Sequence, residues 1–279
     1  MPNSSRLIPQ SPASVMVMRD VTPSITTLSL PFKRFGIIPI GGRATLVKLT
    51  SGGLVVFSPV ALTEEVRAKV LAMGNDVRYI IAPDIEHHIF ISEWKSAYPA
   101  AQLIGPAGLP EKRAKLVGED LKISNDRFDH VFTSQNKGTF AITPEFDADF
   151  AYEFVDAHPN KELVFFFRPD RVLIEADLMF NLPATEQYSR VPGEDGKPGW
   201  MGWIFTKLQS TAGDAKGQKQ FLWHLASRGD RPAFNESVRR IAEWDFETVI
   251  PCHGDVIQRN GKQVFEKVFE WHLKKEGDL

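Results

Sequence analysis

The stretch from residue 54 to residue 82, LVVFSPVALTEEVRAKVLAMGNDVRYIIA, decides the fold class. Its first four residues, 54–57, form a short apolar run that is typical of a buried strand. Thr63 then predicts a helix N-cap with two glutamates in the first turn, and Gly74 predicts the helix end. A second apolar run over 77–82 predicts another strand. This strand–helix–strand order favours a layered α/β protein.

The alternation of strands and helices continues on both sides of this stretch. Ser92 predicts the N-cap of a second helix over 93–98. Further strands are predicted over 25–30, 43–49, 102–105, 140–143, 162–167, 172–175 and 247–250, and further helices over 218–227, 233–244 and 264–274. No change in composition marks a linker. We therefore expect a single domain over 15–279, preceded by a flexible segment over 1–14.

The composition is that of a globular protein with no strong excess of either charge. The chain has 279 residues, with 33 lysines and arginines against 35 aspartates and glutamates, for a net charge of −2. This balance argues against nucleic acid or a membrane as a partner. The sequence contains no signal peptide and no apolar run of about 20 residues. Its one cysteine, Cys252, fits a reducing compartment, so we expect a cytoplasmic protein.

Histidines and one aspartate gather at or just beyond the predicted strand ends. They are His87, His88, His158, Asp177 and His253. In α/β sheets, functional sites lie at the carboxyl ends of strands, so these side chains are candidates for one site. Several imidazoles with a carboxylate suit Zn²⁺, or Fe²⁺ and Mn²⁺. The alternative for each histidine is an ordinary hydrogen-bonded or surface position.

Cys252 directly precedes His253, which raises the possibility of a thiol–imidazole pair. Adjacent side chains that leave a strand point in different directions, and Cys252 shares its parity with Ile250, an apparent core position. We therefore interpret Cys252 as a small buried residue rather than as a nucleophile.

Several sequence blocks together resemble one known family. They are GLVVFSPVALT (53–63), IAP (81–83), HHIF (87–90), EW (93–94), YPA (98–100), DLMFNLP (177–183) and IPCHGD (250–255). From about Val17 to Trp271 the chain resembles the DUF4336 family, a divergent branch of the metallo-β-lactamase-like superfamily. The resemblance implies an αββα sandwich, in which two mixed sheets lie between helical layers.

The metal-binding loop of the superfamily has the pattern His-x-His-x-Asp-His. Its first two histidines fall on Pro83 and Ile85, whose side chains cannot bind a metal, and its Asp and last His fall on His87 and His88. The later ligands of the superfamily match His158, Asp177 and His253. The resemblance therefore implies one divalent metal rather than two, with Zn²⁺ favoured over Fe²⁺ and Mn²⁺.

The resemblance also implies a metal-dependent enzyme. We expect a hydrolase of an ester, lactone or thioester that uses a water molecule activated by the metal, with Asp177 or Asp255 accepting a proton. Two alternatives use the same residues. One is a non-hydrolytic lyase or isomerase, and the other is a binding protein with a retired active site. A redox role at an iron site is a third alternative.

An aromatic insert over about 181–217 lies between the last two predicted ligands. The rings of the insert and its flank are Tyr188, Trp200, Trp203, Phe205 and Trp223. As a group they could form a lid over a small aromatic or apolar substrate, although each ring alone is more typical of core packing. Arg190, Lys197 and Lys207 would then bind a substrate carboxylate.

Overall fold

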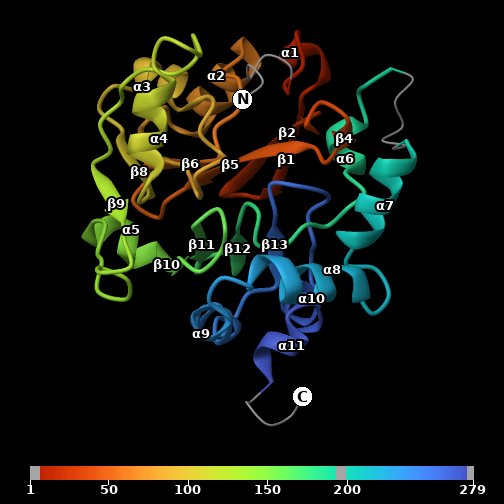
Figure 1. Cartoon of the computed structure of the whole chain (residues 1–279). Helices are drawn as coiled ribbons and strands as arrows, with labels where there is room; N and C mark the ends of the chain where they lie inside the picture. Colours follow the sequence, from red (N-terminus) through yellow and green to blue (C-terminus); the bar gives the residue numbers. More distant parts are fainter. Residues whose placement is uncertain (1–6, 193–198, 275–279) are drawn as a thin grey trace.

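The first of two stacked β-sheets has seven strands, as seen in the computed structural model, which describes residues 7–192 and 199–274 (Figure 1). In spatial order its strands are β1 (Val17–Thr22), β2 (Ile25–Leu30), β5 (Gly42–Lys48), β6 (Leu54–Phe57), β7 (Val77–Ile81), β8 (Gln102–Pro106) and β9 (His130–Phe132). Neighbouring strands from β1 to β6 pair antiparallel, and neighbouring strands from β6 to β9 pair parallel, so the sheet is mixed.

The second sheet has four strands and is also mixed. They are β10 (Phe150–Val155), β11 (Glu162–Phe167), β12 (Val172–Ile174) and β13 (Thr248–Ile250). Only β12 and β13 run parallel. A separate two-stranded hairpin is formed by β3 (Lys33–Arg34) and β4 (Ile38–Pro39).

Helices cover the outer faces of both sheets (Figure 1). The first sheet is covered by α2 (Glu64–Met73), α3 (Ile91–Ala97) and α4 (Leu109–Leu116). The second is covered by α8 (Lys216–Phe221), the π-helix η2 (Leu222–Ala226), α9 (Arg231–Ala242), α10 (Gly261–Val268) and α11 (Glu270–Leu273). The remaining described helices are α1 (Pro12–Val15), α5 (Pro144–Asp149), α6 (Thr185–Tyr188) and α7 (Trp200–Leu208). The predicted αββα sandwich is therefore confirmed.

The alternation of side chains along β11 joins the layers. Phe165 and Phe167 belong to the core between the two sheets, whereas Val164 and Phe166 pack against the helices below. This is the period of two that a strand imposes. The rings of Phe57, on β6, and Phe165 lie 5.0 Å apart between centroids, so aromatic contacts hold the sheets together.

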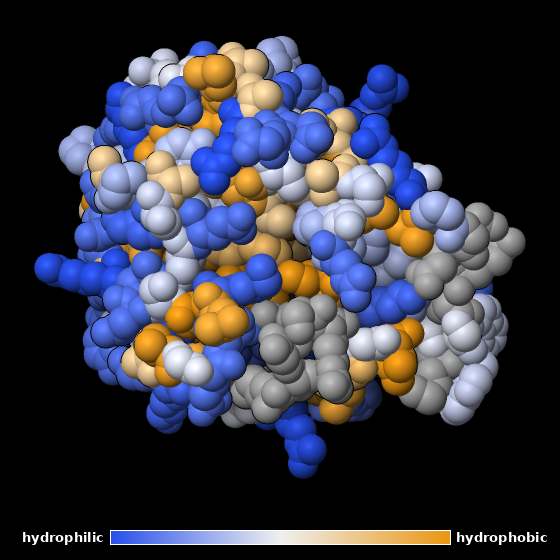
Figure 2. Space-filling model, turned by 90° about the horizontal axis from the view of Figure 1, so that it is seen from above, coloured by the Kyte–Doolittle hydropathy of each residue, from blue (hydrophilic) through white to orange (hydrophobic). Residues whose placement is uncertain are grey.

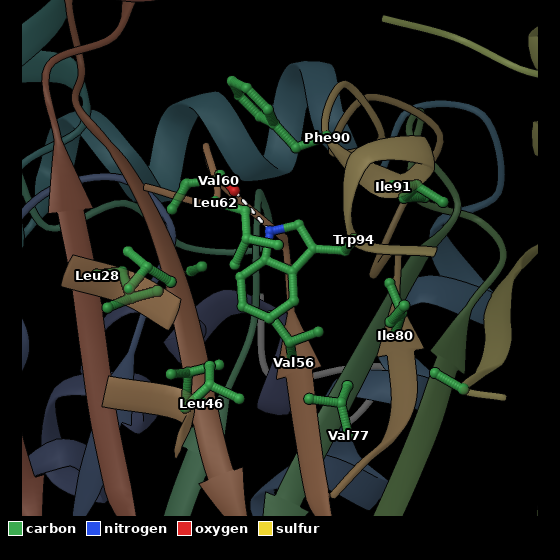
Figure 3. Close-up of a cluster of buried hydrophobic side chains, with 14 of the residues drawn as sticks. Leu28, Leu46, Val56, Val60, Leu62, Val77, Ile80, Phe90, Ile91 and Trp94 are labelled. Atoms are coloured by element: carbon green, nitrogen blue, oxygen red, sulfur yellow. Dashed lines mark hydrogen bonds between the residues drawn. The ribbon is translucent and has the colours of Figure 1, made fainter. Parts of the chain in front are cut away.

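Helix α3 is fixed against the first sheet by its tryptophan. Figure 3 shows Trp94 pointing into a cluster that includes Leu46, Val56 and Ile80 of the strands. The indole Nε1 donates a hydrogen bond of 2.7 Å to the Val60 carbonyl. Because the loop before α3 carries the predicted metal ligands, this anchor also fixes one end of that loop.

Two sequence predictions for local structure are wrong. Residues 140–143 form no strand, because Thr143 caps helix α5 by accepting a hydrogen bond from the Phe146 amide. Ser92 does not cap helix α3, whose N-cap position is held by Phe90. The Ser92 hydroxyl instead contacts a buried ion pair.

The N-terminal segment predicted to be flexible is only partly described. Its first six residues lie outside the described ranges, and residues 12–15 form helix α1. Within 7–192 and 199–274, no helix is long and apolar enough to cross a membrane.

Candidate metal centre

Three of the predicted ligands meet at one point. His87 lies in the loop after β7, Asp177 follows β12 and His253 follows β13, so each comes from the carboxyl end of a strand. His253 Nε2 lies 3.1 Å from His87 Nε2 and 3.1 Å from Asp177 Oδ1. One ligand atom from each residue falls within 4.8 Å of the other two. These distances allow a single ion to bind all three.

When both imidazoles are neutral, as metal binding requires, their hydrogen bonds leave both Nε2 atoms without a proton. His87 Nδ1 donates to Asp84 Oδ1 at 2.9 Å, and His253 Nδ1 donates to the Gly41 carbonyl at 2.6 Å. A neutral imidazole carries one N–H, so these partners fix both tautomers. Asp177 Oδ1 is buried and has no hydrogen-bond donor among residues 7–192 and 199–274. Three lone pairs therefore converge, which fits the donor set of a cation.

Buried carboxylates give the site an excess of negative charge. Burial lowers the pKa of His87, but the carboxylates of Asp84 and Asp177 outweigh it and raise that pKa to about 10. Burial raises the pKa of Asp177, but His253 and His87 hold it well below its usual range. Burial lowers the pKa of His253. The surroundings of His87 therefore favour a positive charge at this point, from a proton or from a metal ion.

The backbone around Asp177 is held by a second buried carboxylate. Glu162 accepts hydrogen bonds from the amides of Ala176, at 2.6 Å, and Asp177, at 3.0 Å. Asn160 Nδ2 donates to Asp177 Oδ2 at 2.5 Å. This leaves Oδ1 as the oxygen that faces the two histidines, so the neighbours orient the carboxylate.

The turn that carries His253 is locked by an arginine and a glycine. Arg43 is buried and donates from Nη1 to the carbonyls of Pro251 and Gly254, both at 2.6 Å. Gly254 has a φ of +89°, and a Cβ there would overlap the Asn181 carbonyl. Only glycine fits both conditions.

His88 and His158, the other predicted ligands, lie outside this group. Arg113 Nη1 donates to the His88 carbonyl at 2.7 Å and lies 3.4 Å from His88 Nδ1. Burial, with Lys112 and Arg113, lowers the pKa of His88 to about 3, so this histidine is neutral. His158 Nδ1 accepts from the Asn160 amide at 3.3 Å. Its ring therefore supports the segment that orients Asp177.

Asp255, the other residue predicted to accept a proton, is hydrogen-bonded to the start of a helix. One carboxylate oxygen accepts from the Glu186 amide at 2.9 Å and the other from the Thr185 hydroxyl, at the start of α6. Both oxygens are thus engaged away from the three ligands. Asp177 is the predicted catalytic carboxylate that the structure places at the site.

The remaining sequence interpretations concern residues around the loop. Cys252 is buried, burial raises the pKa of its thiol, and its Sγ donates to Ser58 Oγ at 2.9 Å, which fits a packing role. Pro83 and Ile85, which replace two superfamily ligands, link the loop to the second sheet. The Pro83 carbonyl accepts from the Leu163 amide at 2.6 Å, and the Ile85 amide donates to the Asn160 carbonyl at 3.0 Å.

A cavity of about 450 Å³ opens above the three ligands. Its wall is largely apolar, with Leu30, Phe32, Ile40, Val60, Ile89, Phe90, Leu116 and Ile123. Leu7 and Ile8 of the N-terminal segment also line it. Its volume lies in the range of small-molecule sites.

The aromatic insert does not contribute a described residue to this cavity. Trp200 and Trp203 of α7 are 75% and 56% exposed. Ile204 and Leu208 of the same helix are also exposed, and Figure 2 shows hydrophobic residues on the side of the molecule where Figure 1 places α7. Arg190 donates to the Met16 carbonyl, and Lys207 lies against the Trp203 ring. Lys197 lies outside the described residues. Helix α7 contacts strand β4 of the hairpin, and the described part of the insert does not line the cavity.

Sequence reasoning missed the residues that hold the ligands in place. They are Gly41, Arg43, Asp84, Asn160 and Glu162. Asp84 had a usable signal, because it precedes His87 by three residues in the same loop. Asn160 and Glu162 lie two and four residues after His158, whereas nothing in the spacing of Gly41 and Arg43 connects them to the site.

Comparisons with known proteins show the family and the fold of the chain. Residues 35–195 match the family model described as "Domain of unknown function (DUF4336)". No curated protein matches the chain. A metallo-β-lactamase structure from Pontibacter korlensis is 11% identical, with a TM-score of 0.54 over 93% of this chain and 100% of that one. The likeness at this identity shows the fold, so the chain has the metallo-β-lactamase fold.

Two flavodiiron proteins share the same architecture. The metal-soaked flavodiiron core from Synechocystis sp. PCC6803 is 12% identical, with a TM-score of 0.60 over 94% of this chain and 62% of that one. A mutant flavodiiron protein from Thermotoga maritima is 13% identical, with a TM-score of 0.57 over 92% of this chain and 62% of that one. The fold is therefore shared by proteins named for different chemistries.

Proposed function

The chain belongs to the DUF4336 family, and from this starting point we propose that it is a metal-dependent hydrolase of an ester, lactone or thioester. One divalent metal is held by His87, Asp177 and His253. The observation that carries the proposal is the convergence of two Nε2 atoms, whose rings already donate from Nδ1, with a carboxylate oxygen that has no hydrogen-bond donor among the described residues. Three protein ligands with an open position are typical of catalytic rather than structural zinc sites.

The metal supplies a Lewis acid that polarises a carbonyl and lowers the pKa of water. The chain supplies orientation and exclusion of water. Asp84 and the Gly41 carbonyl hold the two imidazoles, and the apolar wall around Phe32 removes bulk solvent from the acyl group. Hydrolysis adds the hydroxyl of water to the carbonyl carbon and a proton to the departing alkoxide or thiolate. In this proposal Asp177 Oδ1 binds the metal, and Asp177 Oδ2, which accepts a hydrogen bond from Asn160, is the predicted proton acceptor.

The metal is Zn²⁺ in this proposal, with Fe²⁺ and Mn²⁺ as alternatives, because two histidines and one carboxylate suit all three ions. The substrate is a small apolar or aromatic molecule that enters the cavity. We place the protein in the cytoplasm, since its single cysteine is a buried free thiol. We propose neither a nucleic acid nor a membrane as a partner.

Metal content of protein purified without a metal-affinity tag tests the first half of the proposal. We expect about one equivalent in the parent protein and none in His253→Ala. His224→Ala is the matched control, because His224 is exposed and far from the three ligands in sequence. A folded parent that takes up neither Zn²⁺ nor Mn²⁺ nor anaerobic Fe²⁺ would sink the metal proposal.

Hydrolysis assays test the second half. Alkyl and aromatic esters, thioesters and lactones are the first panel, and turnover should stop on chelation and return when the metal is added back. His253→Ala should lose at least about 100-fold in rate, and His224→Ala should retain the parent rate. A metal-loaded protein that hydrolyses none of these would contradict the hydrolase and leave the lyase or isomerase to be tested.

A further inference from the structure

The wall of the cavity combines apolar side chains with a few charged groups. The charged groups that line it are Arg34, Arg43, Glu86, Lys112, Asp120 and Asp177. In an otherwise apolar pocket, polar groups fix the orientation of a ligand. A charged wall residue that already has a protein partner is less available for this role than one without.

Two of the three cations on the wall are satisfied by the protein. Arg43 is buried, binds the backbone of the His253 turn and pairs with Glu186 at 3.2 Å. Lys112 donates to the Ile85 carbonyl and to Glu86 Oε1, both at 2.7 Å. These cations stabilise the walls and leave little for a ligand.

Arg34 is different. It is half-buried in strand β3, and within residues 7–192 and 199–274 its guanidinium has no hydrogen bond and no ion pair. Its Cζ lies 5.4 Å from the centroid of the Phe35 ring, and its positive charge also acts on the carboxylate of Asp177. The hairpin that carries it adjoins Gly41, whose amide donates to the Phe32 carbonyl at 3.1 Å and whose carbonyl holds His253. Arg34 therefore lines the same cavity as the ligands as a cation whose N–H groups have no acceptor among the described residues.

We infer that Arg34 anchors the carboxylate of an apolar, anionic substrate whose hydrocarbon part fills the cavity. A planar guanidinium matches a carboxylate with two parallel hydrogen bonds, which a neutral group cannot reproduce. A volume of about 450 Å³ holds on the order of 15 non-hydrogen atoms, at roughly 30 Å³ each. The inference rests on the proposed function, because it assumes that the site acts on a substrate, and it names the class of that substrate.

The inference differs from the sequence expectation about the insert. That expectation assigned a substrate carboxylate to Arg190, Lys197 and Lys207. Arg190 is bound to the backbone of Met16, and neither Arg190 nor Lys207 lines the cavity. Arg34 satisfies the same chemical requirement from the hairpin.

Binding of decanoate and 1-decanol tests the inference without requiring turnover. The two probes share one chain and differ in charge, and their affinities are measured by displacement of an apolar fluorescent dye. We expect decanoate to bind the parent more tightly than 1-decanol. Arg34→Gln should weaken decanoate by about tenfold or more and leave 1-decanol unchanged, which also shows that the cavity is intact. Arg34→Lys should recover part of the loss.

Arg228→Gln is the matched control, because Arg228 is exposed and does not line the cavity, and it should bind both probes like the parent. Equal affinity of the parent for the two probes would overturn the inference, as would an equal loss of both in Arg34→Gln.

The same titrations in His253→Ala separate this inference from the proposed function. Retention of the decanoate preference there supports an anchor at Arg34, even if the metal or hydrolase proposal fails. If His253→Ala lost the preference for decanoate over 1-decanol and Arg34→Gln kept it, the carboxylate would bind at the three metal ligands. That result would overturn the inference and leave the proposed function standing.

Discussion

At the scale of single residues, the site is defined by buried acceptors that lack donors. Asp84 is fully buried and Asp177 is buried. In the part of the chain that the structure describes, neither Asp84 Oδ2 nor Asp177 Oδ1 has a hydrogen-bond partner. A buried polar atom without a partner costs about 1–3 kcal/mol. A bound cation would offset part of this cost, so the unfavourable arrangement of these oxygens is consistent with selection for binding rather than for stability.

Asp84→Asn tests the role of the negative charge behind His87. Asparagine keeps the size of the side chain and an oxygen that can accept from His87 Nδ1, but it removes the charge. We expect metal affinity to fall by about 10- to 100-fold, because the carboxylate behind a ligating histidine raises its basicity. Competition with a chelating dye measures the affinity. Asp214→Asn, at an exposed position, is the control and should bind the metal as tightly as the parent. The parent's affinity in Asp84→Asn would show that the charge behind His87 does not affect metal binding.

At the scale of elements, the turn after β13 has little freedom to change. Gly254→Ala adds a methyl group that overlaps the Asn181 carbonyl at a positive φ. We expect the free energy of unfolding to fall by about 2 kcal/mol or more, and metal binding to weaken because His253 is displaced. Urea denaturation measures the first effect.

Gly229→Ala is the control for this substitution, because Gly229 is exposed with open space around its Cα and no positive φ. Its free energy of unfolding should stay within about 0.5 kcal/mol of that of the parent. A Gly254→Ala protein as stable as Gly229→Ala would show that the Asn181–Gly254 contact is adaptable.

The sequence predicts elements well where one local signal decides them. Thr63 and Gly74 bound helix α2 as expected, because the cap hydrogen bond to the Val66 amide needs only nearby residues. Residues 140–143 were assigned wrongly because a short apolar run is ambiguous, and the Thr143–Pro144 pair starts a helix there.

The site was predictable only in part, for a related reason. His87, Asp177 and His253 could be named because they follow strands, whose carboxyl ends share one edge. Their supports could not, because Arg43 reaches the His253 turn across more than 200 residues of chain. Such contacts exist only after the two sheets have docked.

At the scale of the whole molecule, stability should depend on the histidine of the last helix. His272 is buried, and its Nδ1 donates to Asn235 Oδ1 at 2.7 Å, joining α11 to α9. Burial, with the charge of Arg231, lowers the pKa of His272 to about 4, below its ordinary value of 6.5. The unfolded chain therefore binds a proton more readily, and stability is lost as the pH falls from about 6.5 to about 4.

We expect His272→Phe to show a weaker loss of stability over this range than the parent, by up to about 3 kcal/mol. Phenylalanine keeps the contacts with the neighbouring rings of Trp223 and Phe234 but cannot titrate. Urea denaturation at pH 7 and pH 4.5 measures the difference. His224→Phe, at an exposed position, should keep the slope of the parent, and an identical slope in His272→Phe would contradict the assignment.

The three ligands come from both halves of the sandwich: His87 leaves the first sheet, whereas Asp177 and His253 leave the second. An ion held by all three would link the two sheets in the folded protein, and this link would be absent from the unfolded chain. By thermodynamic linkage, a free metal concentration 100 times the dissociation constant adds about 2.7 kcal/mol to the folded state. Under the metal proposal, starvation for that metal would shorten the lifetime of the protein in the cell as well as silence its site.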